Sequence, residues 1–162
     1  MQRNDWCTCS KVKKEIIMKT DLSIIIVNYK SWDKLQLCLE SILNQNQINL
    51  QIIIVDNFSN DNRLKDFKIR FKQINWIENK NNLGFAKACN IGATHSESKW
   101  LLFLNPDTIL DKNSLSSLIK FSNLNKEHRL IGIKQLNKKN IIQCLWFILN
   151  TWTITVSFVF YR

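Results

Sequence analysis

The chain has 162 residues, of which 45% are hydrophobic and 22% are charged, a composition typical of a globular domain with an apolar core. Its formal net charge of +10 favours an anionic partner, but the basic residues are scattered and no nucleic-acid-binding motif accompanies them, so nucleic acid is not an expected ligand. The 5 cysteines have neither the spacing of a zinc site nor that of a secreted disulfide framework, which favours a reducing, cytoplasmic location.

The two ends of the chain differ from its middle in composition. Residues 1–17 are polar and basic and lack the apolar segment of a signal peptide, and Met18 opens a segment that reads as a natural start just before a strand. We interpret residues 1–17 as a disordered leader or an over-long start, residues 18–140 as the main domain, and residues 141–162 as an apolar C-terminal tail.

Short apolar runs alternate with amphipathic segments along the main domain. The runs predict buried strands at residues 22–27, 52–55, 74–77 and 100–104. Helices are expected after the capping residue Ser31, over residues 64–71, from Gly84 to Ala93, and from Asn113 or Ser114 onward. Strands that alternate with helices in this way predict an α/β fold with a mainly parallel sheet covered by helices on both faces.

Polar clusters containing Asn28, Asp56 and Asp107 follow three of these predicted strands. In parallel sheets of this kind, ligands bind beyond the carboxyl ends of the strands. The sequence therefore predicts that the three side chains contribute to one ligand site.

Asp107 is a candidate metal ligand, because it lies just past a buried strand and beside the amide of Asn105. Such hard oxygen atoms suit Mg²⁺ or Mn²⁺, and the cation would bridge the phosphates of a nucleotide and neutralise charge on a leaving diphosphate. The alternative is that the segment Asn105–Thr108 is only a turn, with Pro106 at its second position.

Two further segments each allow a functional and a structural interpretation. Asp56 either accepts hydrogen bonds from a base or ribose or caps the segment that follows it. Gly84 either allows a close backbone approach to a ligand, with the helix N-terminus and Lys87 favouring phosphate, or opens a small-residue helix that packs tightly on the sheet.

Four motifs, in this order and spacing, resemble family-2 glycosyltransferases of the GT-A fold, and most of all their rhamnosyltransferase-like members. The motifs are SIIIVNYKSWDKLQLCLESIL, IIIVDNFSND, NLGFAKACNIGA and LLFLNPDTIL, and the resemblance extends from about Asp21 to Asn140. It implies that the main domain is a Rossmann-like domain that binds a nucleotide-diphosphate sugar, dTDP- or UDP-linked.

The resemblance also assigns roles to single residues. It implies that Asn28 and Asp56 hold the nucleoside and that Asn82, Gly84 and Asn90 shape the diphosphate-sugar pocket. Asn105-Pro106-Asp107 matches the family's Asp-x-Asp metal motif with Asn in the first place, so Asp107 would supply most of the affinity for Mg²⁺ or Mn²⁺. The complete predicted set for the nucleotide-sugar is Asn28, Asp56, Asn57, Asn82, Gly84, Phe85, Asn90 and Asn105, with Asp107 for the metal.

The expected reaction is an inverting transfer of a hexosyl or rhamnosyl group to a glycan or lipid-linked acceptor in cell-surface polysaccharide synthesis. Inversion needs a base, which members of the family carry in a second half. After Asp111 the chain has one acidic residue, Glu127, a poor match, so no catalytic base is assigned and a truncated product is expected.

The apolar stretch Leu145–Tyr161 has two interpretations: an interfacial or membrane-embedded tail, close to the shortest length that crosses a bilayer, or a core segment that has lost its packing partners. Three other functions remain open. They are a nucleotide-binding module without transferase activity, a membrane-tethered basic interaction protein in which the Asn-Pro-Asp turn is only structural, and a nucleotidyltransferase. The last is disfavoured because Asn28-Tyr29-Lys30 is not a glycine- and arginine-rich loop.

Overall fold

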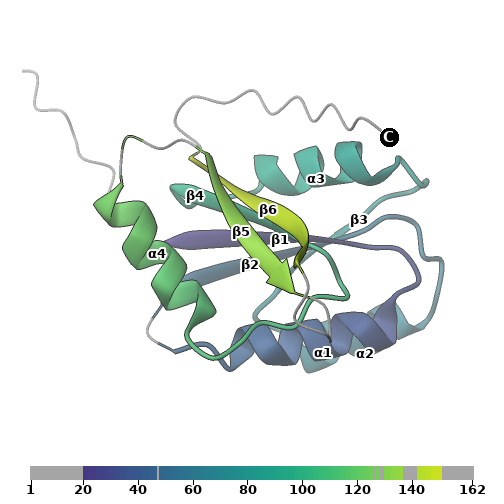
Figure 1. The fold of residues 1–162 in the computed structure, drawn as a ribbon. Helices are drawn as coiled ribbons and strands as arrows, with labels where there is room; N and C mark the ends of the chain where they lie inside the picture. Colours follow the sequence, from purple (N-terminus) through teal and green to yellow (C-terminus); the bar gives the residue numbers. More distant parts are fainter. Residues whose placement is uncertain (1–19, 47, 126, 128–129, 137–141, 151–162) are drawn as a thin grey trace, which may run out of the picture.

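The computed structural model describes residues 20–46, 48–125, 127, 130–136 and 142–150. The predicted leader, residues 1–17, and the last part of the predicted tail, residues 151–162, lie outside this description. The described residues form an α/β domain, in which helices flank a twisted sheet (Figure 1).

Six strands form one sheet in the order β3-β2-β1-β4-β6-β5. The strands are β1 (Leu22–Asn28), β2 (Leu50–Asp56), β3 (Asn75–Glu78), β4 (Trp100–Leu104), β5 (Leu130–Leu136) and β6 (Ile142–Asn150). β1 pairs in parallel with both β2 and β4, and β2 pairs in parallel with β3, whereas β6 is antiparallel to β4 and to β5. The prediction of a mainly parallel sheet is therefore confirmed.

The four helices cover both faces of the sheet, as the alternating pattern predicted. They are α1 (Trp32–Leu43), α2 (Arg63–Arg70), α3 (Phe85–Thr94) and α4 (Ser114–Leu124). In Figure 1, α1 and α2 lie on one side of the sheet and α3 on the other. Successive residues of a strand point to opposite faces, so Ile24 packs toward the first side and Ile25 toward the second.

The larger of the two cores lies beneath α1, α2 and α4. The predicted apolar face of α1 is buried in full, and Trp32 adds an indole ring that contacts Phe67 of α2 with 5.0 Å between ring centroids. Ser31 stands at the N-cap position of α1 but makes no capping hydrogen bond, because its hydroxyl donates to the Tyr29 carbonyl instead.

α3 packs unusually close to the sheet. A Cβ atom added to Gly92 would lie 2.5 Å from Ile25 Cγ2 and 3.2 Å from Val55 Cγ2. Ala88 and Cys89 complete the contact and are buried. The small residues of this helix therefore set its distance from β1 and β2, in agreement with the structural interpretation of this segment.

The C-terminal part of the described chain belongs to the sheet. The predicted boundary between residues 140 and 141 falls between β5 and β6, and these two strands pair with each other. β6 also pairs with β4 in the interior of the sheet. Residues 142–150, which all lie within the predicted tail (residues 141–162), are therefore a sheet strand in this structure.

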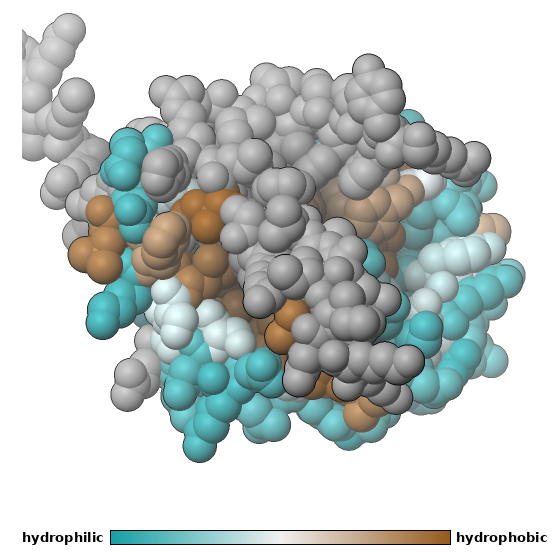
Figure 2. Space-filling view, in the orientation of Figure 1, coloured by the Kyte–Doolittle hydropathy of each residue, from teal (hydrophilic) through white to brown (hydrophobic). Residues whose placement is uncertain are grey.

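The surface is mixed in character. Figure 2 shows hydrophilic residues along the lower and right-hand parts of the view, and apolar residues both on the side where α4 lies in Figure 1 and toward the opposite side. Phe121 and Leu124 of α4 contribute exposed apolar surface, and 74% of Leu124 is exposed. Within the described ranges, no helix combines the length and hydrophobicity needed to span a bilayer.

Candidate functional site

Asn28 and Asp56 lie side by side at the carboxyl ends of β1 and β2. They are direct partners in the parallel register, and both are buried, with 0% and 3% of their surfaces exposed. The Asn28 amide donates a hydrogen bond of 2.9 Å to Asp56 Oδ1. Because a buried carboxylate is costly unless it accepts hydrogen bonds, this contact stabilises Asp56 at the strand end.

Ser59 completes the support of the Asp56 carboxylate. Its backbone N–H donates to Asp56 Oδ2 over 3.0 Å, and its hydroxyl donates to Asp56 Oδ1. The Lys30 N–H donates to the Ser59 hydroxyl oxygen, so the loops after β1 and β2 are joined through this side chain. Sequence reasoning did not single out Ser59, although its position three residues after Asp56 is typical of a local side-chain-to-backbone turn.

The Asn28 side chain forms hydrogen bonds to neighbouring residues and has no solvent-exposed surface. Besides Asp56, its amide reaches Ser59 Oγ at 3.3 Å, and its Oδ1 accepts the Ser31 N–H at 3.2 Å. This side chain is fully buried, so in this structure it offers no exposed surface for a ligand, whereas Asp56 lines a pocket. The capping interpretation of Asp56 holds in part: the carboxylate closes a turn with Ser59, but α2 begins only at Arg63.

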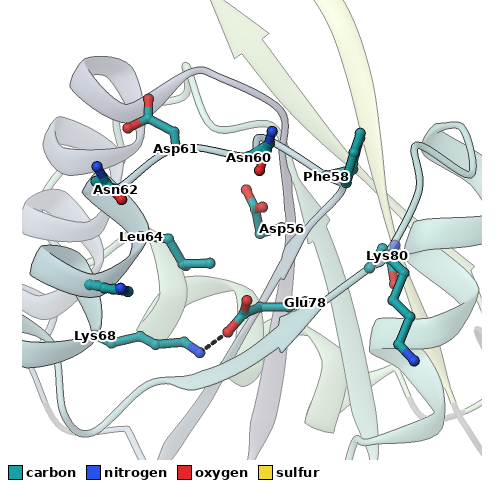
Figure 3. Close-up of a pocket in the computed structure, with 11 residues that line it drawn as sticks. Asp56, Phe58, Asn60, Asp61, Asn62, Leu64, Lys68, Glu78 and Lys80 are labelled. Carbon is teal, nitrogen blue, oxygen red and sulfur yellow. Dashed lines mark hydrogen bonds and ion pairs between the residues drawn. The ribbon is translucent and has the colours of Figure 1, made fainter.

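A pocket of about 470 Å³ opens beside Asp56 (Figure 3). It lies between the loop after β2, the first turns of α2 and the end of β3. Lys68 and Glu78 form an ion pair across its wall, and Lys80 lies at its rim in Figure 3. The lining residues are Asp56, Phe58, Asn60, Asp61, Asn62, Leu64, Lys65, Lys68, Glu78, Asn79 and Lys80.

Backbone strain is concentrated in the loops at this edge of the sheet. Lys30, Phe58 and Asn60 have φ angles of 56°, 70° and 50°, in the left-handed region that side chains other than glycine rarely adopt. Phe58 is bulky and 42% exposed, and it lines the pocket. Strain of this kind persists where the surrounding contacts fix the conformation, as the Ser59 hydrogen bonds do here.

Asn57 connects the loop after β2 to the loop after β3. Its Nδ2 donates to Asn82 Oδ1 at 2.8 Å, and its Oδ1 accepts hydrogen bonds from Asn79 Nδ2 and from the Leu83 N–H. Asn57 is 3% exposed and thus a buried cross-link, whereas Asn82 is exposed at the same edge. Two of the predicted site residues are therefore in direct contact.

Gly84 is the N-cap residue of α3, with φ 79° and ψ 162°. A Cβ atom there would meet nothing within 4 Å, so glycine is required by the backbone conformation and not by a close neighbour. The Gly84 N–H donates to Asn82 Oδ1. Phe85 and Lys87 lie exposed in the first turn of α3, and the buried Oδ1 of Asn90 has no partner among the described residues.

Asn105 to Thr108 form a turn directly after β4. The Thr108 N–H donates to the Asn105 carbonyl at 3.2 Å, as the structural interpretation of this segment predicted. Asp107 occupies the third position of the turn and is exposed, and among the described residues none donates a hydrogen bond to its carboxylate. The turn therefore presents Asp107 to solvent, and the two interpretations of the segment are compatible.

The residues around Asp107 fit a cation that a ligand would share. The described part of the chain contains no group of three or more His, Cys, Asp or Glu residues that could hold a metal ion by themselves. Mg²⁺ in nucleotide sites usually has one or two carboxylate ligands, and phosphates and water complete its coordination. Asp107 and the neighbouring Asn105 match that requirement.

The topology brings these elements to one edge of the sheet. β1 lies between β2 and β4, so the Asn28–Asp56 contact and the Asn105–Thr108 turn follow neighbouring strands. The sequence model of glycosyl transferase family 2 matches residues 23–146, which contain all of these side chains. The chain belongs to glycosyl transferase family 2.

Several curated relatives with similar sequences are named as glycosyltransferases. An uncharacterized glycosyltransferase of Haemophilus influenzae is 36% identical over 86 residues, which cover 53% of this chain and 29% of the relative. Glycosyltransferase GlyG of Streptococcus pneumoniae is 27% identical over 100 residues, covering 60% of this chain and 33% of GlyG. A Rickettsia bellii glycosyltransferase is matched over 17% of its length, so the chain spans about a sixth to a third of these family-2 relatives.

Solved structures share the fold. Staphylococcus aureus TarS 1-349, in a crystal structure with UDP-GlcNAc, has a TM-score of 0.66 and 22% identity, covering 76% of this chain and 37% of TarS. The structure of the same protein with UDP has a TM-score of 0.67 and 21% identity, covering 76% of this chain and 38% of TarS. The domain therefore has the GT-A glycosyltransferase fold.

Proposed function

We propose that this family-2 domain binds the nucleotide-diphosphate-sugar donor of a glycosyltransferase, and that the nucleotide moiety of the donor is a uridine or thymidine nucleotide. The observation that carries the proposal is the Asp56 carboxylate, which Asn28 and Ser59 hold at the wall of a pocket of about 470 Å³. An acidic side chain at a strand end can accept hydrogen bonds from a base or a ribose. The TarS structures with UDP and UDP-GlcNAc support a uridine nucleotide.

We propose that the diphosphate lies toward α3 and the turn after β4. The first turn of α3 contains Lys87 and no acidic residue, and its N-terminus starts at Gly84 without a side-chain cap. The positive end of a helix dipole together with a lysine favours an anionic group. Both features lie at the same edge of the sheet as Asp56 and Asp107.

Asp107 is the proposed ligand for Mg²⁺ or Mn²⁺, with Asn105 beside it. The bound cation would neutralise negative charge on the diphosphate as it leaves. The exposed carboxylate, without a hydrogen-bond donor among the described residues, supports this role because it is available to a ligand.

For the complete reaction we propose transfer of a hexosyl group, with rhamnosyl as one candidate, to a glycan or lipid-linked acceptor in cell-surface polysaccharide synthesis, with inversion. One relative is a teichoic acid poly(glycerol phosphate) polymerase of Staphylococcus epidermidis, 33% identical over 107 residues, and its name supports a cell-surface polymer as the product class. Such an acceptor would place the protein in the cytoplasm, in peripheral contact with the inner face of the membrane.

Calorimetric titration of UDP and of dTDP into the full chain, with and without Mn²⁺, tests the binding step. We expect binding by at least one nucleotide, a clear increase in affinity with Mn²⁺, and loss of that increase in Asp107→Ala. Asp111→Ala serves as the control, because Asp111 is also exposed and lies in the same loop. Absence of binding by both nucleotides would overturn the proposal.

A nucleotide-binding module without transferase activity is the second candidate. Nucleotide binding and sugar transfer are separable, because only transfer needs a base for the acceptor hydroxyl. Nucleotide binding without sugar transfer to any of a panel of lipid-linked acceptors would favour this candidate.

A further inference from the structure

The turn that presents Asp107 is attached to α1 on both sides of that residue. Three side chains of α1 and its C-terminal extension, Cys38, Ser41 and Gln45, face the loop between β4 and α4. Their spacing of three and four residues places them on one side of the helix. We call them the α1 anchor.

Cys38 lies directly under the turn. Its thiol donates to the Asn105 carbonyl at 3.7 Å, the same carbonyl that accepts the Thr108 N–H and closes the turn. The side chain is fully buried, so the contact is shielded from water.

Ser41 and Gln45 attach the rest of the loop. The Ser41 hydroxyl accepts the Leu110 N–H at 3.1 Å and donates to the Cys38 carbonyl at 2.7 Å. Gln45 Nε2 donates to the Asp111 carbonyl at 2.9 Å, and Gln45 Oε1 accepts the Leu115 N–H at 3.2 Å. The attachment points therefore lie before and after Asp107, although nothing described donates to its carboxylate.

We propose that the α1 anchor positions the Asp107 carboxylate for the donor-bound cation, so that Ser41 and Gln45 are positioning residues of the metal site. This inference rests on the proposed function. A carboxylate that is free at its tip binds a shared cation well only if its backbone is held in place, because ordering the loop on binding would cost affinity. The hydrogen bonds of the α1 anchor fix the loop between β4 and α4 before a ligand binds.

Four variants separate positioning from general stability. Ser41→Ala removes the acceptor for Leu110, and Ser41→Thr keeps a hydroxyl. Gln45→Leu removes all three side-chain hydrogen bonds of Gln45, to the Asp111 carbonyl, the Leu115 N–H and the Ser41 carbonyl. Gln45→Glu keeps an acceptor for Leu115 and loses the donor to the two carbonyls. Gln36→Leu is the matched control, because Gln36 bonds only to Glu40 among the described residues and lies on the same helix.

Amide hydrogen exchange gives a readout that needs no metal. We expect faster exchange at Leu110 in Ser41→Ala and at Leu115 in Gln45→Leu, with protection at Leu110 restored by Ser41→Thr and protection at Leu115 retained in Gln45→Glu. Gln36→Leu should leave both amides unchanged. Unchanged exchange in Ser41→Ala and Gln45→Leu would overturn the anchor.

UDP titration with and without Mn²⁺ gives the second readout. We expect the ratio of the two affinities to fall about fivefold in Ser41→Ala, the effect of one lost hydrogen bond to the loop, and by at least as much in Gln45→Leu, which loses more than one, while metal-free affinity stays unchanged. If the wild-type chain binds UDP without a Mn²⁺ effect, the metal function fails and the inference fails with it. If the wild-type chain shows the effect and the variants retain it fully, only the inference fails.

Discussion

Asn28 and Asp56 are register partners on adjacent parallel strands, and an amide-to-carboxylate hydrogen bond of 2.9 Å joins them inside the protein. Most residues of β1 and β2 contribute only apolar packing. This polar pair therefore lies where the apolar core ends, at the carboxyl edge of the sheet. The Ser59 hydroxyl donates to Asp56 and accepts the Lys30 N–H, so these hydrogen bonds connect the pair to the loops that follow β2 and β1.

Asn28→Ala should reduce the free energy of unfolding by about 2 kcal/mol, because it leaves the buried Asp56 carboxylate with one donor fewer. Affinity for UDP should fall as well, although Asn28 has no exposed surface with which to contact a ligand. Urea denaturation and UDP titration measure the two effects. Asn75→Ala on β3 is the control, because Asn75 is exposed and should change neither quantity appreciably.

Equal stability of Asn28→Ala and Asn75→Ala would contradict the importance of the buried hydrogen bond. A loss of stability with unchanged affinity for UDP would show that Asp56 keeps its position without Asn28. Either result would require a different account of how the end of β2 presents its carboxylate.

The sequence contained enough information for the parallel half of the fold and for the edge where the site lies. Solid apolar runs such as Ile52–Val55 mark buried strands, and the polar residues directly after them mark the carboxyl ends. The antiparallel β6 was not predicted, because a long apolar run at residues 145–161 has the same pattern whether it spans a bilayer or fills the middle of a sheet.

The details of the site depended on contacts between distant segments. Ser59 gave only a local signal, and its contacts with Asn28 and Lys30 exist only because β1 and β2 are neighbours. The attachment of the Asp107 turn to Cys38 joins segments 67 residues apart in the sequence. The polar contact of Cys38 therefore could not be predicted without the fold.

Gly92→Ala should destabilise the domain by about 1–3 kcal/mol, the usual effect of overpacking a dense core. The new methyl group would lie 2.5 Å from Ile25 Cγ2, so α3 would have to move away from β1 or Ile25 would have to adopt a less favourable conformation. Urea denaturation of Gly92→Ala, Ile25→Ala and the double variant gives a double-mutant cycle. We expect the double variant to be more stable than the sum of the single effects predicts, and strict additivity would exclude the steric explanation.

Gly84→Ala should be destabilising for a different reason. The new methyl group would meet no atom within 4 Å, but the backbone at φ 79° and ψ 162° is strained for any residue with a side chain, by about 1–3 kcal/mol. Combination with Ile25→Ala should therefore bring no relief, in contrast to Gly92→Ala. Urea denaturation checks this difference, and a Gly84→Ala variant as stable as the wild-type chain would show that the loop adopts another conformation at little cost.

The buried thiol of Cys89 should make stability fall with increasing alkalinity. Burial raises the pKa of Cys89 to about 12 from an ordinary value of 9.0, so above pH 9 the unfolded chain loses this proton while the folded chain keeps it. The free energy of unfolding should then decrease between about pH 9 and pH 12, by on the order of 1 kcal/mol per pH unit for one such thiol. Urea denaturation at pH 8, 9 and 10 should show a shallower decrease in Cys89→Ala than in the wild-type chain, since other titrating groups are common to both. Parallel curves for the two proteins would mean that the Cys89 thiol is not shielded from water in the folded state.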